Sequence, residues 1–189
     1  MAFDAVLHFP LPDGYGTLHP KGESKIVPDG IALTDEWSFS LENKLNITQH
    51  TSGAGAGKAQ FEAFTIKKQV DKSSAHLFMS CGSGAHFNGV NLKLFKAGGR
   101  LEGAQKNAFV IWTFNMLAVE KIEWSYADPA PEENVTFKFG SCALAYGIQE
   151  SDGKLKPALN AMGSWNQISN VIDFRSGIEA AVEALKILG

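Results

Sequence analysis

The segment Thr51–Lys58 comes closest to a chemical motif, because its glycines and final lysine suggest a phosphate-binding loop. Such a loop requires G-x-x-x-x-G-K followed by Ser or Thr, since the last hydroxyl holds magnesium. Here the glycines are spaced differently, and Ala59 stands where the hydroxyl residue is needed. The segment also lies between two predicted strands, whereas a phosphate-binding loop leads from a strand into a helix. We therefore exclude nucleotide binding and predict a long hairpin loop, in which Gly and Ala offer little steric resistance.

The histidines and cysteines have no spacing typical of a metal site or a nucleophile. The five histidines, at positions 8, 19, 50, 76 and 86, form no HxH or HxxxH pair, and four zinc ligands cannot be assembled from the pattern. Cys81 follows Leu77 and Phe78 in a predicted helix, which favours core packing over a Cys–His nucleophile. We predict that Cys81 and Cys142 are buried, reduced and inert, and that the protein holds no metal or cofactor.

The carboxylates do not form a motif either. Glu120 and Glu123 lie near one predicted strand, and Glu132 and Glu133 lie in a Pro-rich turn. Because a glycosidase pair is defined by distance in space, a small β-barrel hydrolase stays open as an alternative. Turn charges are usually solvated, so we predict exposed side chains and no enzyme activity.

Composition sets the broad class. With 189 residues, 44% hydrophobic and 11% aromatic, the chain suits a single domain with a substantial core. A net charge of −3 excludes a generally basic surface for nucleic acid. The aromatic stripes lack interleaved basic residues, so we expect them to form core and not a platform on which bases stack. No stretch is apolar enough to insert into a membrane. The first ten residues lack the basic and apolar regions of a signal peptide, which predicts synthesis and folding in the cytoplasm.

Period-two alternation predicts a mainly β protein, either a two-sheet sandwich or a closed barrel. Alternating runs occur at 3–9, 36–42, 90–94, 121–126 and 135–139. The run Phe109–Trp112 is apolar at every position, so we expect this strand to be covered on both faces. The abundance of bulky aromatics argues against a ligand-binding barrel with an internal cavity, because such side chains fill a small barrel.

Two segments favour helix. Residues 71–81 carry Leu77, Phe78 and Cys81 on one helical face, with Asp71 or Ser73 as N-cap and Gly82 as the stop. We expect this short helix to lie over a barrel side or mouth. A capping box at Ser176–Glu179 precedes apolar residues at helical spacing and predicts an amphipathic helix over 177–188. Its apolar face must pack on its own barrel or on a neighbouring subunit. The predicted organisation is a β domain at 1–170 and a helical extension at 171–189.

Several short motifs occur in an order that resembles one family. They are residues 1–9, Gly22–Lys25, Ala56–Lys58, Phe64–Lys67, Val70–Ser74, Leu77–Met79, Cys81–Gly84, Lys96–Gly99 and Glu133–Phe137. Over about residues 1–170 the chain resembles Hcp, the haemolysin-coregulated tube protein of the type VI secretion system.

The resemblance implies a compact two-sheet β-barrel with a helix on one side, six copies of which form a ring. Stacked rings form a hollow tube inside a contractile sheath, and the tube leaves the cell without a signal peptide. The implied partners are further copies of the chain, the sheath, the baseplate and spike proteins, and effectors carried in the lumen. The resemblance implies no catalytic residue and no cofactor. A tail-tube protein of a phage or another contractile injection system is the nearest alternative.

The resemblance also implies a role for the Gly-rich loop, which reaches from one ring to the next. The residues that correspond to it are Gln49, His50, Thr51, Ser52, Gly53, Ala54, Gly55, Ala56, Gly57 and Lys58. The helix at the C-terminus is a departure, because many members end soon after a segment like Met162–Asn166. Three roles stay open for it: to cover the barrel, to support the subunit contact or to narrow the lumen.

Overall fold

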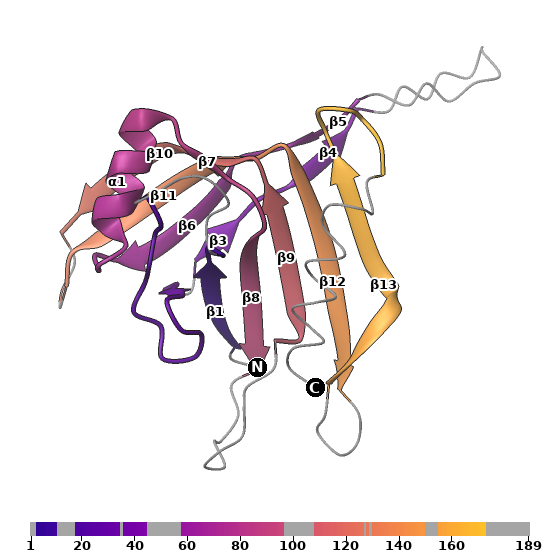
Figure 1. The fold of residues 1–189 in the computed structure, drawn as a ribbon, viewed down its shortest axis with the longest axis horizontal. Helices are drawn as coiled ribbons and strands as arrows, with labels where there is room; N and C mark the ends of the chain where they lie inside the picture. The colour runs from indigo at the N-terminus through magenta and orange to yellow at the C-terminus, as the bar shows by residue number, and fades with distance from the viewer. Residues whose placement is uncertain are drawn as a thin grey trace.

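The computed structural model describes residues 3–10, 18–34, 36–44, 58–96, 108–126, 128, 130–149 and 155–172. These residues form two antiparallel sheets packed face to face, with a two-stranded ribbon extending beyond them and one helix at the opposite side (Figure 1). The protein is therefore mainly β, as predicted. Of the two predicted architectures, the sandwich is the one present, because each described sheet keeps two edge strands.

The larger sheet has six strands in the order β13-β12-β9-β8-β1-β2. Its strands are β1 (Phe3–His8), β2 (Ile31–Ala32), β8 (Val90–Lys96), β9 (Val110–Asn115), β12 (Ser141–Gln149) and β13 (Leu155–Asn166). The smaller sheet has five strands in the order β3-β6-β11-β10-β7. They are β3 (Trp37–Ser38), β6 (Phe64–Gln69), β7 (His86–Phe87), β10 (Leu117–Ser125) and β11 (Glu132–Lys138). The ribbon consists of β4 (Leu41–Asn43) and β5 (Ala59–Phe61).

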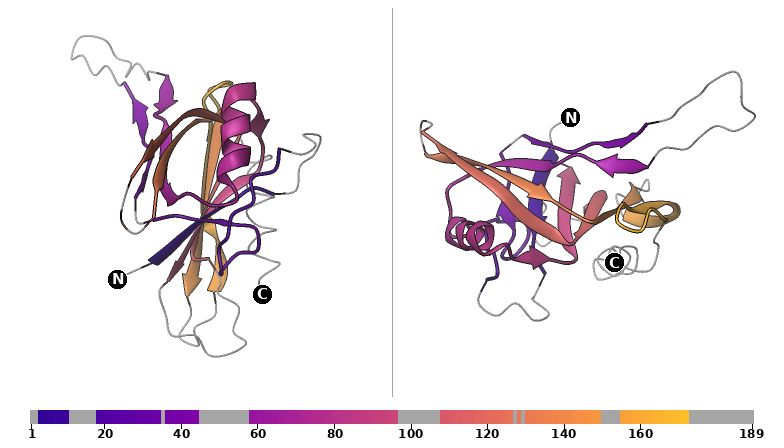
Figure 2. Two further views of the ribbon diagram at one scale, coloured as in Figure 1. Left: turned by 90° about the vertical axis from the view of Figure 1, so that its left-hand side faces the viewer. Right: turned by 90° about the horizontal axis from the view of Figure 1, so that it is seen from above.

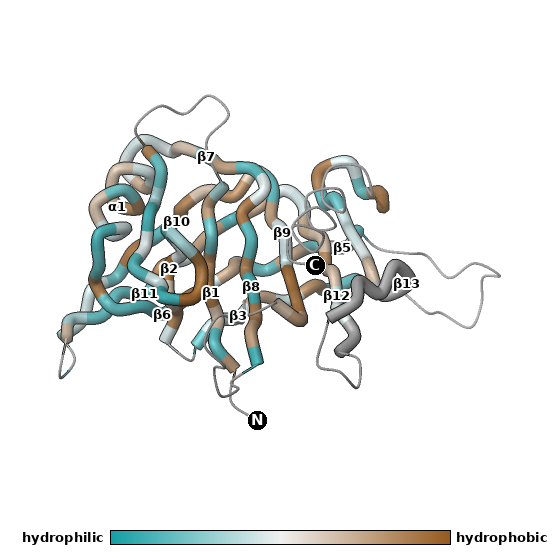
Figure 3. The backbone as a smooth tube through the Cα atoms, turned by 60° about the horizontal axis from the view of Figure 1, so that its bottom comes forward, coloured by the Kyte–Doolittle hydropathy of each residue, from teal (hydrophilic) through white to brown (hydrophobic). Residues whose placement is uncertain are grey.

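The main core lies between the two sheets and is built from the alternating apolar positions. Apolar and polar residues alternate along much of β8 in the hydropathy colouring (Figure 3). Phe64 of the smaller sheet stacks on Phe114 of the larger one with ring centroids 4.7 Å apart. Phe39 meets Trp112 edge to face at 4.9 Å. Large aromatic rings thus fill the space between the sheets, as the composition predicts.

Two short connections join the larger sheet to the smaller one, each between strands that follow one another in the chain. Only Met116 separates β9 from β10, and its φ of 51° lies in the left-handed region that turns the chain sharply. Asn115 fixes this corner, because its side-chain oxygen accepts a 2.8 Å bond from the Gly89 N–H. Phe139 and Gly140 form the second crossing, between β11 and β12. Each pair of strands therefore connects the two layers of the sandwich.

The outer face of the six-stranded sheet is covered in part by residues 18–34. Val27 and Ile26 of this segment belong to a second apolar cluster with Val6 and Ile111 of the sheet. A Cβ on Gly22 would lie 2.3 Å from the Gly30 carbonyl oxygen, so only glycine permits this close approach. Because Ile111 faces this cluster while Trp112 packs against the main core, the prediction that Phe109–Trp112 is covered on both faces is confirmed.

The side helix α1 (Ser74–Ser83) packs on β10 and buries Leu77 (Figures 1 and 2). Ser73 occupies the N-cap position without a side-chain capping bond, and Asp71 instead accepts the Ser73 N–H at 2.9 Å. The predicted stop at Gly82 is wrong, because the helix continues to Ser83 and ends at Gly84 with φ 69°. Phe78 was expected on the buried face but is 61% exposed.

Two further expectations need comment. The single strand predicted over 36–42 is broken into β3 and β4, and Leu41 is exposed because β4 has left the sheets to join the ribbon. The helix predicted over 177–188 lies outside the described residues, which end at Ile172, so the structure does not bear it out.

Candidate functional site: the assembly surfaces

The ribbon β4–β5 is the most prominent projection of the described structure (Figures 1 and 2). Its ladder pairs Leu41 with Phe61 and Asn43 with Ala59. All three residues of β4 are exposed, and Leu41 is 54% exposed although it is apolar. The predicted stacking loop joins the two strands of this ribbon. Of its residues, the exposed Lys58 is described, and Gln49–Gly57 lie outside the described residues.

Gln167 fixes the ribbon to the body of the sandwich. Its side-chain oxygen accepts a 3.0 Å hydrogen bond from the Phe61 N–H of β5. Its side-chain nitrogen donates to the Phe139 carbonyl, and its backbone N–H donates to the Gly140 carbonyl at 3.1 Å. One side chain therefore connects the ribbon to the crossing between β11 and β12. Sequence reasoning missed this residue, since a glutamine after a strand has no distinctive pattern.

A groove of about 830 Å³ lies beside the ribbon, between it and the strands β12 and β13. Its walls are mainly apolar and rich in aromatic rings: Trp37, Phe39, Leu41, Phe61, Trp112, Leu144 and Trp165. Phe61 is also in contact with Phe139, with ring centroids 4.9 Å apart. An exposed leucine next to an apolar groove is typical of a surface that binds another protein.

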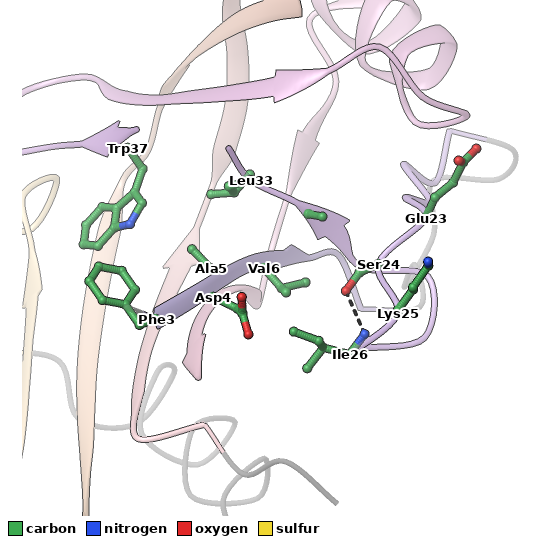
Figure 4. A pocket seen from close by; sticks show the side chains of 11 residues that line it. Phe3, Asp4, Ala5, Val6, Glu23, Ser24, Lys25, Ile26, Leu33 and Trp37 are labelled. Carbon is green, nitrogen blue, oxygen red and sulfur yellow. Dashed lines mark hydrogen bonds between the residues drawn. The ribbon is translucent and has the colours of Figure 1, made fainter. Parts of the chain in front are cut away.

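The two edges of the larger sheet differ strongly from one another. β13 extends over 12 residues, whereas β2 at the opposite edge has two. A cavity of about 540 Å³ lies by the short edge, and Phe3, Leu33 and Trp37 line it (Figure 4). Glu23 and Lys25 lie at its other end. Unlike edges suit a head-to-tail contact, in which one edge of a subunit meets the other edge of the next.

A buried ion network anchors α1 to the smaller sheet. Lys68 and Glu133 are both completely buried, with their charged groups 2.7 Å apart. Lys68 also contacts Asp71 at 2.9 Å. Glu133 accepts hydrogen bonds from the Ser74 hydroxyl at 2.9 Å and the Trp124 indole N–H at 2.8 Å. The network therefore gives Asp71 and Ser74 a shared role, because each satisfies a buried charge at the start of the helix.

This network corrects the prediction for Glu133, which was expected to be solvated. Glu132, next to it, points to the other side of β11 and pairs with the partly exposed Lys67 at 3.1 Å. Glu120 and Glu123 are exposed, as predicted. Because strand residues alternate in direction, two neighbouring glutamates of one strand have opposite environments.

The cysteines and histidines form no reactive arrangement in the described part of the chain. Cys142 is buried, which raises the pKa of its thiol far above the usual range, while Cys81 is only partly buried, contrary to prediction. No group of three or more His, Cys, Asp or Glu side chains in the described ranges is close enough to hold a metal ion. No described helix is long and apolar enough to cross a membrane.

Comparisons with known proteins agree with this picture. The family model "Type VI secretion system effector, Hcp" matches residues 21–146. Protein hcp1 of Pseudomonas aeruginosa is 30% identical over 116 residues, which are 60% of this chain and 68% of that protein.

Solved structures show the same fold at lower identity. A type six secretion system protein has a TM-score of 0.73 at 21% identity, over 91% of this chain and 100% of that chain. Hcp1 from Salmonella typhimurium has a TM-score of 0.64 at 21% identity, over 92% and 100% of the two chains. The predicted mainly β fold with one side helix is thus confirmed. The chain belongs to the Hcp family and is a tube subunit of a type VI secretion system.

Proposed function

We propose that six copies of this chain form a closed ring, and that the rings stack into the tube. The observation that carries this proposal is the exposed, partly apolar ribbon beside an aromatic groove. In a monomer this apolar surface stays exposed to water, whereas a repeating assembly buries it. The Hcp family membership supports the same conclusion.

Within the ring, we assign the contact to the two unlike edges of the larger sheet. The long edge strand β13 of one subunit would meet the short edge near β2 of the next. A head-to-tail contact that repeats with a closing rotation leaves no free edge, and this removes the tendency of exposed strands to aggregate.

Between rings, we assign the contact to Gln49–Lys58 at the end of the ribbon. This segment is rich in Gly and Ala, so it loses conformational entropy when it docks. This loss opposes docking, so we expect isolated rings to stack weakly. A sheath or baseplate that templates the tube would strengthen the stacking. We expect effectors to travel in the lumen, and the protein to leave the cytoplasm through the apparatus. The chain would thus act by assembly and not by catalysis.

Native mass spectrometry and negative-stain imaging of the full chain test this proposal. We expect a hexamer with a central hole, and short stacks at high concentration. A stable monomer at every concentration would contradict the ring.

Deletion of residues 51–57 tests the stacking loop separately. The matched control replaces the same seven positions with an alternating Gly-Ser sequence, which keeps the loop length. We expect the deletion to leave hexamers intact and to abolish tubes in cells. Unchanged tube formation after the deletion would show that this loop does not join the rings.

A further inference from the structure

Met116 has a backbone conformation that the fold alone does not explain. Three non-glycine residues of the described chain have a positive φ: Asp29 at 58°, Asn170 at 57° and Met116 at 51°. Asp and Asn tolerate this left-handed region because their short polar side chains can bond locally, whereas Met has no such compensation. Met116 nevertheless forms the whole corner between β9 and β10, and its side chain is 50% exposed. A corner selected for folding alone favours Gly or Asn at this position.

The corner is held in place by hydrogen bonds from neighbouring segments. The Asn88 side-chain oxygen accepts the Met116 N–H at 2.9 Å. The Asn115 side-chain oxygen accepts the Gly89 N–H at 2.8 Å, and the Asn115 carbonyl accepts the Gly140 N–H at 3.0 Å. The backbone of Met116 is therefore fixed, and its apolar side chain is presented to solvent from a preformed position.

Ile168 lies beside Met116 and is presented in a similar way. A Cβ on Gly140 would lie 2.7 Å from Cδ1 of Ile168 and 3.3 Å from Cβ of Met116, so both side chains lie against this glycine. Ile168 is 62% exposed, and its N–H donates to the Asn166 side-chain oxygen at 2.9 Å. The described residues that line the shallow pocket of about 400 Å³ at this place are uncharged. We call the two exposed side chains the Met116–Ile168 patch.

The patch lies at the base of the ribbon. Gln167, which precedes Ile168, bonds to Phe61 of the ribbon and to Phe139 of the sheet crossing. Figure 1 shows the end of β13 beside β4 and β5, at the side of the molecule from which the ribbon projects. Because the chain is a tube subunit, copies follow one another along the tube axis. An apolar, uncharged patch beside the ribbon therefore fits a second copy of the chain better than a charged partner.

We propose that the Met116–Ile168 patch packs on a subunit of the next ring and forms the rigid part of the contact between rings. This inference rests on the proposed function, in which rings stack at the ribbon end. A preformed patch loses little conformational entropy when it docks, whereas the Gly-rich loop loses much. The patch therefore supplies apolar contact that the loop lacks, and this gain in the assembled tube offsets the strain at Met116.

Met116→Asn tests the proposal, because Asn accepts a positive φ and removes the apolar contact. Stacking of rings of the full chain is measured by sedimentation velocity and negative-stain imaging at high concentration, and subunit stability by urea unfolding. We expect at least tenfold fewer stacked rings, intact hexamers and a urea midpoint equal to or higher than that of the parent. A purely structural role of Met116 would not weaken stacking while stability is kept or increased.

Two matched variants accompany this change. Met116→Leu keeps an apolar side chain at the strained position and should stack like the parent. Met79→Gln removes another exposed methionine, which is 44% exposed on α1 and lies away from the ribbon. It should also stack like the parent, because only the patch at the base of the ribbon is expected to meet the next ring.

Ile168→Thr tests the patch without any change at the corner. We expect at least fivefold fewer stacked rings, with hexamers and the urea midpoint unchanged, since this side chain is 62% exposed. Val70→Thr is the matched control, because Val70 follows β6 and is 42% exposed. Equal stacking of Ile168→Thr and Val70→Thr would contradict a role for the isoleucine.

Normal stacking of Met116→Asn, beside a parent that stacks, would overturn the inference and leave the proposed function intact. A lower urea midpoint or loss of the hexamer in Met116→Asn would also overturn it, because Met116 would then serve the subunit or the ring. An equal loss of stacking in Met79→Gln would indicate a general effect of lost apolar surface and overturn it as well. A parent that forms no rings, or rings that never stack, would contradict the proposed function itself and the inference with it.

Discussion

At the residue scale, the attachment of the helix to the smaller sheet depends on one buried charge pair, Lys68 and Glu133. Each charge is fully removed from water and is held by other polar groups: Asp71 beside Lys68, and Ser74 and Trp124 beside Glu133. A buried pair of this kind adds little net stability compared with apolar packing, but loss of one partner leaves a charge that water cannot reach.

Glu133→Gln is therefore expected to lower the free energy of unfolding by about 3–5 kcal/mol. Glu132→Gln is the matched control on the adjacent residue, and we expect at most about 1 kcal/mol because the Lys67–Glu132 pair is partly exposed. Urea unfolding of both variants measures the difference. Equal destabilisation would mean that the buried position of Glu133 does not matter energetically.

His8 gives the stability a pH dependence. Burial and the nearby charge of Lys93 lower its pKa from 6.5 to about 4, with a smaller contribution from His19 and an opposing one from Asp29. The unfolded chain thus takes up a proton on this residue near pH 6.5, whereas the folded protein resists protonation until about pH 4. Stability from this residue is complete above pH 7 and decreases as the pH falls from about 7 to about 4.

Between pH 7 and pH 5 we expect His8 to account for a loss of about 1 kcal/mol, after allowance for solvent screening. Urea midpoints at the two pH values should differ less in His8→Gln than in the parent protein. His19→Gln should have a smaller effect, since His19 is less buried. A pH response that is the same in His8→Gln and the parent would contradict this role of His8.

At the element scale, the ribbon depends on a small number of anchoring bonds. Its two strands pair with one another and with no third strand of the described structure. A two-stranded ribbon is marginally stable by itself. The Gln167 side chain, bonded to Phe61 in the ribbon and to Phe139 in the sheet crossing, therefore has a large influence on where the ribbon points.

Gln167→Ala is expected to speed amide hydrogen exchange at Ala59–Phe61 at least fivefold and to reduce tube formation. Gln60→Ala is the matched control, since Gln60 is an exposed glutamine on the ribbon itself. We expect the control to leave both readouts unchanged. Rapid exchange without any loss of tubes would contradict the second expectation, because it would show that assembly does not require an anchored ribbon.

At the scale of the whole molecule, the ribbon, the side helix and the two edges of the larger sheet lie in different parts of the sandwich. The helix lies at one side and the ribbon at the other (Figure 1). The groove lies beside the ribbon. The edge strands β2 and β13 bound the larger sheet. Separate surfaces permit a subunit to use one set of contacts within a ring and another set between rings.

Leu41→Asp tests the ribbon as an assembly surface, because this exposed leucine faces the groove. We expect at least a tenfold weaker assembly by analytical ultracentrifugation, with little change in subunit stability since the side chain is already 54% exposed. Gln60→Glu adds the same charge at another exposed position of the ribbon and should assemble normally. A similar loss in both variants would indicate a general charge effect.

The sequence alone determined that the protein is mainly β, roughly where several of its strands lie, and the family to which it is related. These depend on neighbours along the chain: alternation of apolar residues, turn residues and ordered short motifs. It also predicted the side helix, although the stop at Gly82 came too early.

Only the tertiary structure decided which polar residues are buried and where the ribbon lies. Lys68 and Glu133 are 65 residues apart in the chain, and Phe61 and Gln167 are 106 apart, so no local pattern reveals either contact. The neighbours Glu132 and Glu133 look alike in sequence, but the strand turns one toward solvent and the other toward a buried lysine. Burial depends on which distant strands meet, and short-range periodicity does not contain that information.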